Sequence, residues 1–161
     1  PQNIFQLWSV EELQSIGIYP ITIDSTNEKD SEYYVNTDIT YTVDGLTVKG
    51  TYGTATAKAL TDVLYTADDE TAGLGTEGEV KTPGLKSFHK EKVNGMAATL
   101  LIPTDWYSLR AADGGTAVPS NIATYRAAIR TKANTHTTAI DNAADVDALA
   151  ALVYDWPELG S

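Results

Sequence analysis

The sequence predicts an α+β protein in which strands come first and helices follow. Between residues 33 and 52, β-branched and aromatic residues flank a turn dipeptide, a pattern typical of antiparallel strands. From residue 85 onward, apolar residues recur every three or four positions, as in amphipathic helices. We therefore expect a small antiparallel β module over residues 1–80, then an α-helical module over residues 81–161 formed by a helical hairpin and a short terminal helix.

The first predicted element is a short helix. Ser9 is a suitable N-cap, Glu12 three residues later completes a capping box, and Gly17 is placed to end the helix. Residues 18–23 then read as a strand, and Pro20, which has no N–H, restricts that strand to an edge of a sheet.

A β-hairpin is predicted over residues 39–52. Asp44-Gly45 is a dipeptide favoured in type I′ turns, and it separates two strand-like runs at residues 39–43 and 46–52. In the first run the larger side chains fall on one face by the period-2 rule, and threonines fall on the other. The first face holds Ile39, Tyr41 and Val43, and the second holds Thr40 and Thr42. One face is expected to meet a core or a partner.

The middle of the chain is less regular. Residues 57–65 fit a helix at their start and a strand at their end, and we favour the strand. Residues 68–84 combine glycines with acidic residues, which predicts a loop or linker and places a boundary between two lobes there.

Two long helices are predicted in the second half. Residues 85–102 form the first, which Pro103 should end, and Thr104 or Asp105 should cap a short helix that runs through Arg110. The apolar positions of the first helix are Leu85, Phe88, Val93, Met96, Ala97, Leu100 and Leu101.

Ser120 should cap the second long helix, which is expected to pack antiparallel against the first. Its stripe consists of Ile122, Tyr125, Ile129, Ala133, His136 and Ile140. Asp145 should cap a last helix that ends near Val153.

Composition limits the function classes. The net charge is −11, with a net −10 in residues 1–84 and −1 in residues 85–161, so a nucleic-acid backbone is not expected as a ligand. The acidic half is either a solvated surface or a face for a basic partner or a cation. Cysteine is absent. No apolar run suits a membrane span and no secretory signal is evident, so a soluble protein without membrane partners is expected.

Residues with chemical potential are sparse. His89 and His136 are the two imidazoles, and neither has a carboxylate at helical spacing that would complete a metal site. His136 lies on its helix's apolar stripe, which favours a packed side chain. The acidic run at residues 68–70, with Glu77 and Glu79, lacks the alternate-position pattern of a Ca²⁺ loop, although weak Ca²⁺ binding stays open. We expect no catalytic residues, no cofactor and no resident metal.

Aromatic residues are the stronger candidates for an interface. Tryptophan and tyrosine are favoured at interface hot spots because they combine a large apolar surface with a polar group. The candidates are Trp8, Tyr33, Tyr34, Tyr52 and Trp156. Trp106 and Tyr107 are alternatively a cap on the core between the long helices. Three arginines, Arg110, Arg126 and Arg130, are possible partners for Asp105 or Asp113.

The order of motifs in the second half resembles a known group of proteins. Asp105-Trp106-Tyr107 is followed by Arg110, then by a loop containing Pro119, then by Tyr125-Arg126 and Arg130. This order is similar to that in tail accessory and tail-fibre assembly proteins of tailed bacteriophages, of the type carried by marine phages and cyanophages. The opening residues 7–20 and the closing residues 148–158 resemble the same group, whereas residues 31–81 do not.

The resemblance implies a non-enzymatic structural or assembly protein. It would be a tail component of a virion (fibre, baseplate or neck), made in the host cytoplasm, and its partners would be other phage structural proteins in a symmetric multi-copy assembly. Head decoration protein, tail assembly chaperone and host-glycan binding module remain alternatives. For the last of these, exposed Tyr33, Tyr34 and Tyr52 would contact the sugar.

Overall fold

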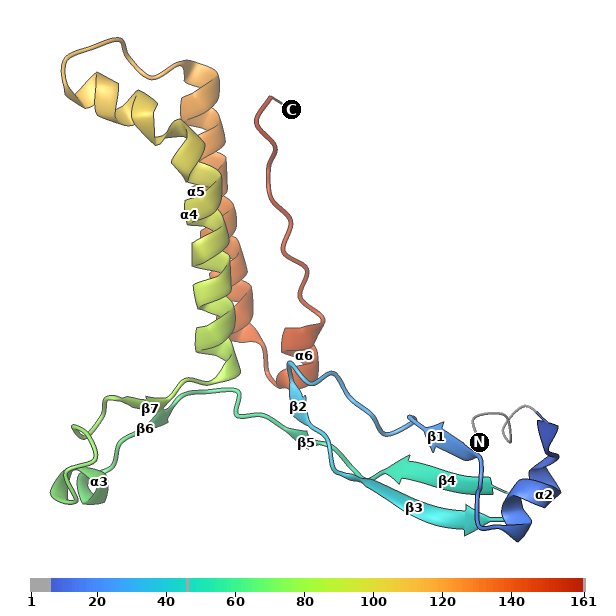
Figure 1. Cartoon of the computed structure of the whole chain (residues 1–161). Helices are drawn as coiled ribbons and strands as arrows, with labels where there is room; N and C mark the ends of the chain where they lie inside the picture. The colour runs from blue at the N-terminus through green and yellow to red at the C-terminus, as the bar shows by residue number, and fades with distance from the viewer. Residues whose placement is uncertain (1–6, 46, 161) are drawn as a thin grey trace. The chain divides into compact units, whose positions relative to one another are not determined.

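The chain folds as an α+β protein, as predicted, with small sheets in its first half followed by a long helical pair and a short helix (Figure 1). The structure is a computed structural model that describes residues 7–45 and 47–160. It divides into two compact units between Lys58 and Ala59, which comes earlier than the boundary expected from composition. Each unit is described below by itself.

The first unit begins with helix α2, Val10–Ser15. The predicted capping box is present, because the Glu12 N–H donates to Ser9 Oγ at 3.2 Å and the Ser9 N–H donates to Glu12 Oε2 at 2.7 Å. The helix ends where predicted, and Gly17 has a φ of 82°. It leads to strand β1, Ile21–Asp24.

The first unit contains a three-stranded sheet with the order β1-β4-β3. Strands β3, Ile39–Asp44, and β4, Thr47–Tyr52, form the predicted antiparallel hairpin. Asp44 pairs with Thr47, and Gly45, which follows Asp44, has a φ of 57°. Residue 46 lies outside the described residues. Strand β1 pairs with β4 in parallel, so the prediction of a purely antiparallel module is wrong for this pair. Strand β1 lies at the edge, as Pro20 requires.

Two further strand pairs are short. Strand β2, Tyr34–Val35, pairs with β5, Thr56–Ala57, and β6, Val63–Leu64, pairs with β7, Val80–Thr82. Residues 57–65 therefore contain the last residue of β5, all of β6 and no helix. The predicted linker at residues 68–84 contains regular structure, because helix α3, Ala67–Thr71, and strand β7 lie in or overlap it. A capping box between Thr66 and Asp69 starts α3, which the composition of this segment concealed.

The first long helix, α4, Leu85–Ala112, is capped by a remote segment. Its N-cap residue is Gly84, which has no side chain to accept the free N–H groups of the first turn. The N–H groups of Gly84, Leu85 and Lys86 donate instead to Asp62 Oδ1, the Ala59 carbonyl and the Leu60 carbonyl, at 2.7–3.0 Å. A Cβ at residue 84 would lie 2.3 Å from the Thr61 carbonyl carbon, so glycine permits this close approach. These bonds join residues 59–62 to the helical unit.

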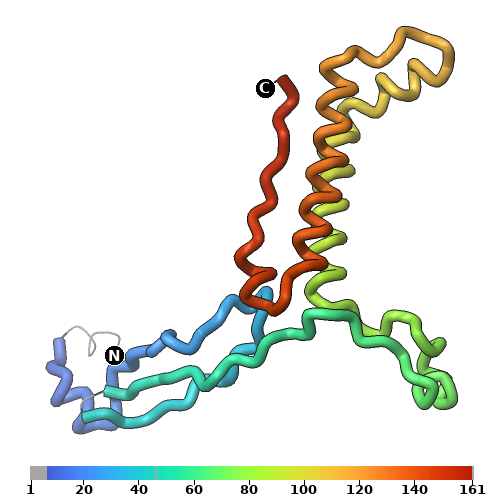
Figure 2. Tube along the Cα trace, turned by 180° about the vertical axis from the view of Figure 1, so that it is seen from behind, coloured from blue at the N-terminus to red at the C-terminus, as the bar shows by residue number. Residues whose placement is uncertain are grey.

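Helix α4 continues through Pro103, contrary to the prediction that the proline ends it. Proline lacks the N–H for the intrahelical bond and crowds the preceding turn, which usually bends a helix. Figures 1 and 2 show that α4 changes direction in its yellow C-terminal part. The Leu100 and Leu101 carbonyls, one turn before, accept hydrogen bonds from Tyr125 and Arg126 of the neighbouring helix. These contacts hold the bent helix together.

The second long helix, α5, Ser120–Asn142, packs antiparallel against α4, as predicted (Figures 1 and 2). Its N-cap is Pro119, and Ser120 is the first helical residue, so the predicted serine cap is wrong. Helix α6, Val146–Ala150, has the predicted Asp145 cap, whose Oδ1 accepts from the Ala148 N–H at 2.7 Å, and it ends before Val153.

The helical core contains fewer of the apolar residues of α4 than the sequence predicts. On α5 the predicted stripe is buried apart from Tyr125, which is half-buried, and Arg126 is added to it. On α4 the prediction is wrong for Phe88 and Met96, which are 45% and 50% exposed. Apolar and polar residues are mixed around α4 with almost no preferred side, so periodicity could not select the buried face. The buried positions of α4 are Leu85, His89, Val93, Ala97 and Thr104.

Replacing Ile129 with alanine tests the position of this core. Ile129 has no exposed surface. Ile129→Ala should lower the free energy of unfolding by about 2–5 kcal/mol, because it removes buried methyl groups and leaves a cavity. Ile102→Ala, at a side chain that is 64% exposed, is the matched control and should change it by less than about 1 kcal/mol. Urea unfolding followed by circular dichroism measures both, and equal effects would place the core elsewhere.

Candidate interaction sites

Residues that carry the phage-protein resemblance meet around one buried arginine. Arg126 of α5 is 8% exposed, and its Nη1 donates to Thr104 Oγ1 at 2.6 Å and to the Leu101 carbonyl at 3.1 Å. The same nitrogen lies 2.8 Å from Asp105 Oδ1, which forms an ion pair with it. Thr104 in turn donates to the Leu101 carbonyl at 2.8 Å. We call Leu101, Thr104, Asp105 and Arg126 the arginine cluster.

The arginine cluster connects the helices and presents no free reactive group. Its guanidinium is shielded from solvent, whereas the Asp105 side chain is 50% exposed and balances its charge from the rim. An arginine is suited to this position because its planar donors can serve several acceptors at once. Sequence reasoning suggested Asp105 as a partner for an arginine but missed Thr104 and the Leu101 carbonyl, since helix periodicity alone does not reveal side chain to backbone bonds between helices.

Trp106, Tyr107 and Arg110 form a second group on α4. The two aromatic rings stack with centroids 3.8 Å apart, and the Arg110 guanidinium lies 4.8 Å from the Trp106 ring and 5.5 Å from the Tyr107 ring. Trp106 remains 49% exposed, so it does not close the core as a cap would. Arg130 is exposed on α5. Ile102 and Leu109, 64% and 66% exposed, share the outer face of α4 with Trp106.

The C-terminal segment, residues 151–160, runs beside the helical pair (Figures 1 and 2). The Asp155 carbonyl lies 2.8 Å from His136 Nε2, and the Asp155 carboxylate accepts from Lys132 at 2.6 Å. This bond to Lys132 is the main cause that lowers the pKa of Asp155. Trp156 and Tyr154 each contact the His136 ring edge-on at 5.3 Å. Contacts within the chain therefore leave Trp156 half-buried. His136 is 5% exposed, so it is a packed side chain, as its position on the apolar stripe predicts.

His89 belongs to the same packed group, which the sequence did not reveal. It is 2% exposed, and its Nδ1 lies 3.3 Å from the Tyr154 hydroxyl. The two histidines thus support the returning C-terminal segment. Within residues 7–45 and 47–160, no three His, Asp or Glu side chains are grouped so that they could hold a metal ion. Asp69 of the acidic run accepts instead from Lys81 at 2.8 Å and from the Thr66 N–H at 3.0 Å.

The predicted aromatic candidates of the first unit lie on separate elements. Trp8 precedes α2 and is 43% exposed. Tyr33 and Tyr34 lie at the β2–β5 pair, whereas Tyr52 belongs to the three-stranded sheet, and all three are half-buried. The structure therefore does not show the three tyrosines as one exposed platform.

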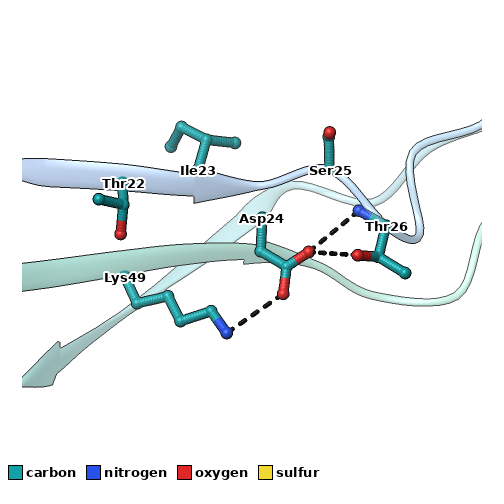
Figure 3. A pocket seen from close by; sticks show the side chains of 6 residues that line it. All are labelled: Thr22, Ile23, Asp24, Ser25, Thr26 and Lys49. Carbon is teal, nitrogen blue, oxygen red and sulfur yellow. Dashed lines mark hydrogen bonds and ion pairs between the residues drawn. The ribbon is translucent and has the colours of Figure 1, made fainter.

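A shallow polar pocket lies at the end of β1, as Figure 3 shows. The Asp24 carboxylate accepts from the Thr26 N–H at 3.0 Å and the Thr26 hydroxyl at 2.6 Å, and Lys49 lies 3.2 Å away. These hydrogen bonds, those from Thr26 first, lower the pKa of Asp24 from 3.8 to about 2. The Asp24 carboxylate is thus bound by groups of the chain itself, and its hydrogen bonds to Thr26 stabilise the turn after β1.

Comparisons with protein-family models, with curated proteins and with solved structures find no significant match. In the part of the chain that the structure describes, none of the helices is both long and apolar enough to cross a membrane.

Replacing Thr104 tests the arginine cluster. Thr104→Val keeps the shape of the side chain but removes the oxygen that accepts from the buried guanidinium, so it should destabilise the protein by about 1–3 kcal/mol. Thr99→Val is the matched control on the same helix, because its hydroxyl donates to the Gly95 carbonyl at the surface. Chemical denaturation compares the two variants. Equal stabilities would show that the cluster contributes little.

The Asp24 turn should make part of the stability depend on pH. Because folding lowers the pKa of Asp24, its contribution is complete above pH 3.8 and is lost as the pH falls from 3.8 to about 2. Asp24→Asn should therefore be less stable than the natural chain near neutral pH, and the difference should shrink across that interval. Urea unfolding at a series of pH values measures it. A difference that stays constant with pH would contradict this role.

Proposed function

We propose that this protein is a non-enzymatic structural or assembly component of a tailed bacteriophage, acting in the tail through protein–protein contacts. The observation that carries the proposal is the exposed apolar surface of helix α4. On α4, Ile102, Trp106 and Leu109 are about half or more exposed along one face. An exposed strip of large apolar side chains of this kind commonly marks a protein–protein contact.

The residues that resemble the phage group support a mechanical role. Asp105 and Arg126 join α4 to α5 within the arginine cluster, and Tyr125 donates to the Leu100 carbonyl at 3.4 Å. Trp106, Tyr107 and Arg110 stack beside this connection. The motif thus sets the geometry of a helical pair and leaves an aromatic surface beside it, which is what a protein that acts by contact requires.

Location in a virion tail, and partners among other phage structural proteins, belong to the same proposal. A symmetric multi-copy assembly would let modest contacts in each copy sum to firm attachment. The host-glycan alternative receives less support, because Tyr33, Tyr34 and Tyr52 are half-buried, and Tyr34 and Tyr52 belong to different sheets.

Mass spectrometry of purified particles of the phage that encodes the chain tests the proposal. A tail component should be present in a fixed ratio to the other tail proteins, and an assembly chaperone should instead associate with them only in lysates before assembly. Absence from both would overturn the proposal. An enzymatic activity abolished by substitution of one carboxylate would overturn it as well.

A substitution on the outer face of α4 tests the contact mechanism. Leu109→Glu should reduce incorporation or co-purification at least about tenfold, because it places a charge in an apolar interface. Asn134→Glu, on the exposed surface of α5, is the control and should behave as the natural chain. Circular dichroism should show that both variants fold. Unchanged incorporation of Leu109→Glu would exclude this face as the contact.

A further inference from the structure

The two faces of the β1-β4-β3 sheet differ completely in chemistry. Strand pairing places Ile21 and Val43 beside Val48, Ile23 and Tyr41 beside Gly50, and Ile39 beside Tyr52. Residues paired in this way point to the same side of a sheet. One face therefore consists of Ile21, Ile23, Ile39, Tyr41, Val43, Val48, Gly50 and Tyr52. We call it the apolar sheet face.

The opposite face holds only threonine and charged residues. It consists of Thr22, Asp24, Thr40, Thr42, Asp44, Thr47, Lys49 and Thr51. The Asp24–Lys49 ion pair lies on this side (Figure 3). A sheet with one polar and one apolar face normally packs its apolar face against another layer, because this removes the apolar side chains from water.

The apolar sheet face is open. Ile21, Ile23, Tyr41 and Val43 are 60%, 49%, 54% and 70% exposed. The centre of the face is closed, because Gly50 lets neighbouring side chains lean over it. A Cβ there would lie 2.8 Å from side-chain atoms of Ile23 and Ile39 and 2.9 Å from Tyr41. The result is an apolar surface whose centre is filled by side chains of the neighbouring strands.

We propose that the apolar sheet face packs against the same face of a second copy of this chain. Charge distribution selects this occupant. Residues 1–58 carry eight acidic and three basic side chains, and so a net charge of −5, yet none of these charges lies on the apolar sheet face. Two acidic copies can therefore approach through this face while their sheet charges point to solvent. A basic partner would find no carboxylate on it, and a glycan would find only the hydroxyls of Tyr41 and Tyr52.

Geometry favours the same arrangement. Sheets pack face to face about 10 Å apart, and a two-fold axis through the face would pair it with itself. A face three strands wide and about five residues long covers roughly 250 Å² in projection, and about twice that as accessible side-chain surface. Two copies would bury about 1,000 Å² in total, the lower limit for a specific interface. We therefore expect a weak, concentration-dependent dimer. This inference does not depend on the proposed phage function.

Sedimentation equilibrium of the full-length chain over about 1–300 µM tests the dimer. The natural chain should pass from monomer to dimer in this range. Val43→Lys should weaken association at least about 30-fold, because the two-fold axis places two lysines in the interface. Thr40→Lys introduces the same side chain on the polar face of the same strand and should leave association unchanged.

A cross-linking experiment identifies the face directly, since the chain contains no cysteine. Val48→Cys lies on the apolar sheet face of the central strand and Thr47→Cys on the polar face, and both positions are half-buried. A bis-maleimide with a span of about 10 Å should give a covalent dimer with the first variant and little with the second.

Three results would overturn the proposal. A natural chain that stays monomeric throughout the concentration range would do so, as would equal effects of the two lysine substitutions. Equal cross-linking of the two cysteine variants would also exclude this face. If Val43→Lys abolished incorporation into phage particles while the natural chain was monomeric, the face would bind a different phage protein. That result would refute self-association and leave the proposed function intact.

Discussion

The helical unit depends on the hydrogen bonds that the Arg126 guanidinium makes beside the Pro103 bend. A proline within a helix removes one backbone hydrogen bond and disturbs the turn before it. Arg126 and Tyr125 reach across from α5 to the Leu100 and Leu101 carbonyls of that turn. Because one partner, Asp105, stays half exposed, the arginine keeps a counter-charge without both charges losing their water. The bend and the pairing of the two helices are therefore one structural feature.

A similar dependence operates at the opposite end of α4. Gly84 has no side chain that could cap the helix, so residues 59–62 accept the hydrogen bonds from the N–H groups at its start. Asp62 also accepts from the Ser87 hydroxyl at 2.8 Å, and the bonds from Gly84 and Ser87 lower its pKa. Residues 59–62 thus belong to the helical unit. The start of α4 and its bend at Pro103 are both fixed by groups distant in the sequence.

The two units place apolar side chains at their surfaces in different ways. In the first, strict alternation along three strands gathers them on one face of a sheet. In the second, apolar side chains are spread around α4 among polar ones, and Ile102, Trp106 and Leu109 stay exposed. The C-terminal segment adds Tyr154 and Trp156 to the packing of the two buried histidines. These surfaces favour a protein that works by contact.

The sequence by itself determined the local elements whose signals lie within a few residues. These include the Ser9–Glu12 capping box, the hairpin of β3 and β4, the Asp145 cap and the buried stripe of α5 from Ile122 to Ile140. Short-range hydrogen bonds and one-sided periodicity are both visible in sequence order. Among the candidate site residues, pairing of Asp105 with an arginine was also foreseeable from charge.

Only the tertiary structure decided the features that depend on distant partners. The parallel pairing of β1 with β4, the passage of α4 through Pro103 and the remote cap at Gly84 all use bonds between residues far apart in the chain. The buried side of α4 was not predictable, because its apolar and polar residues are mixed without a preferred direction. The exposure of Tyr41 and Val43 could not be predicted from the sequence for a related reason. Alternation shows that a strand has two different faces, but only the packing of the whole chain shows whether the apolar face is covered.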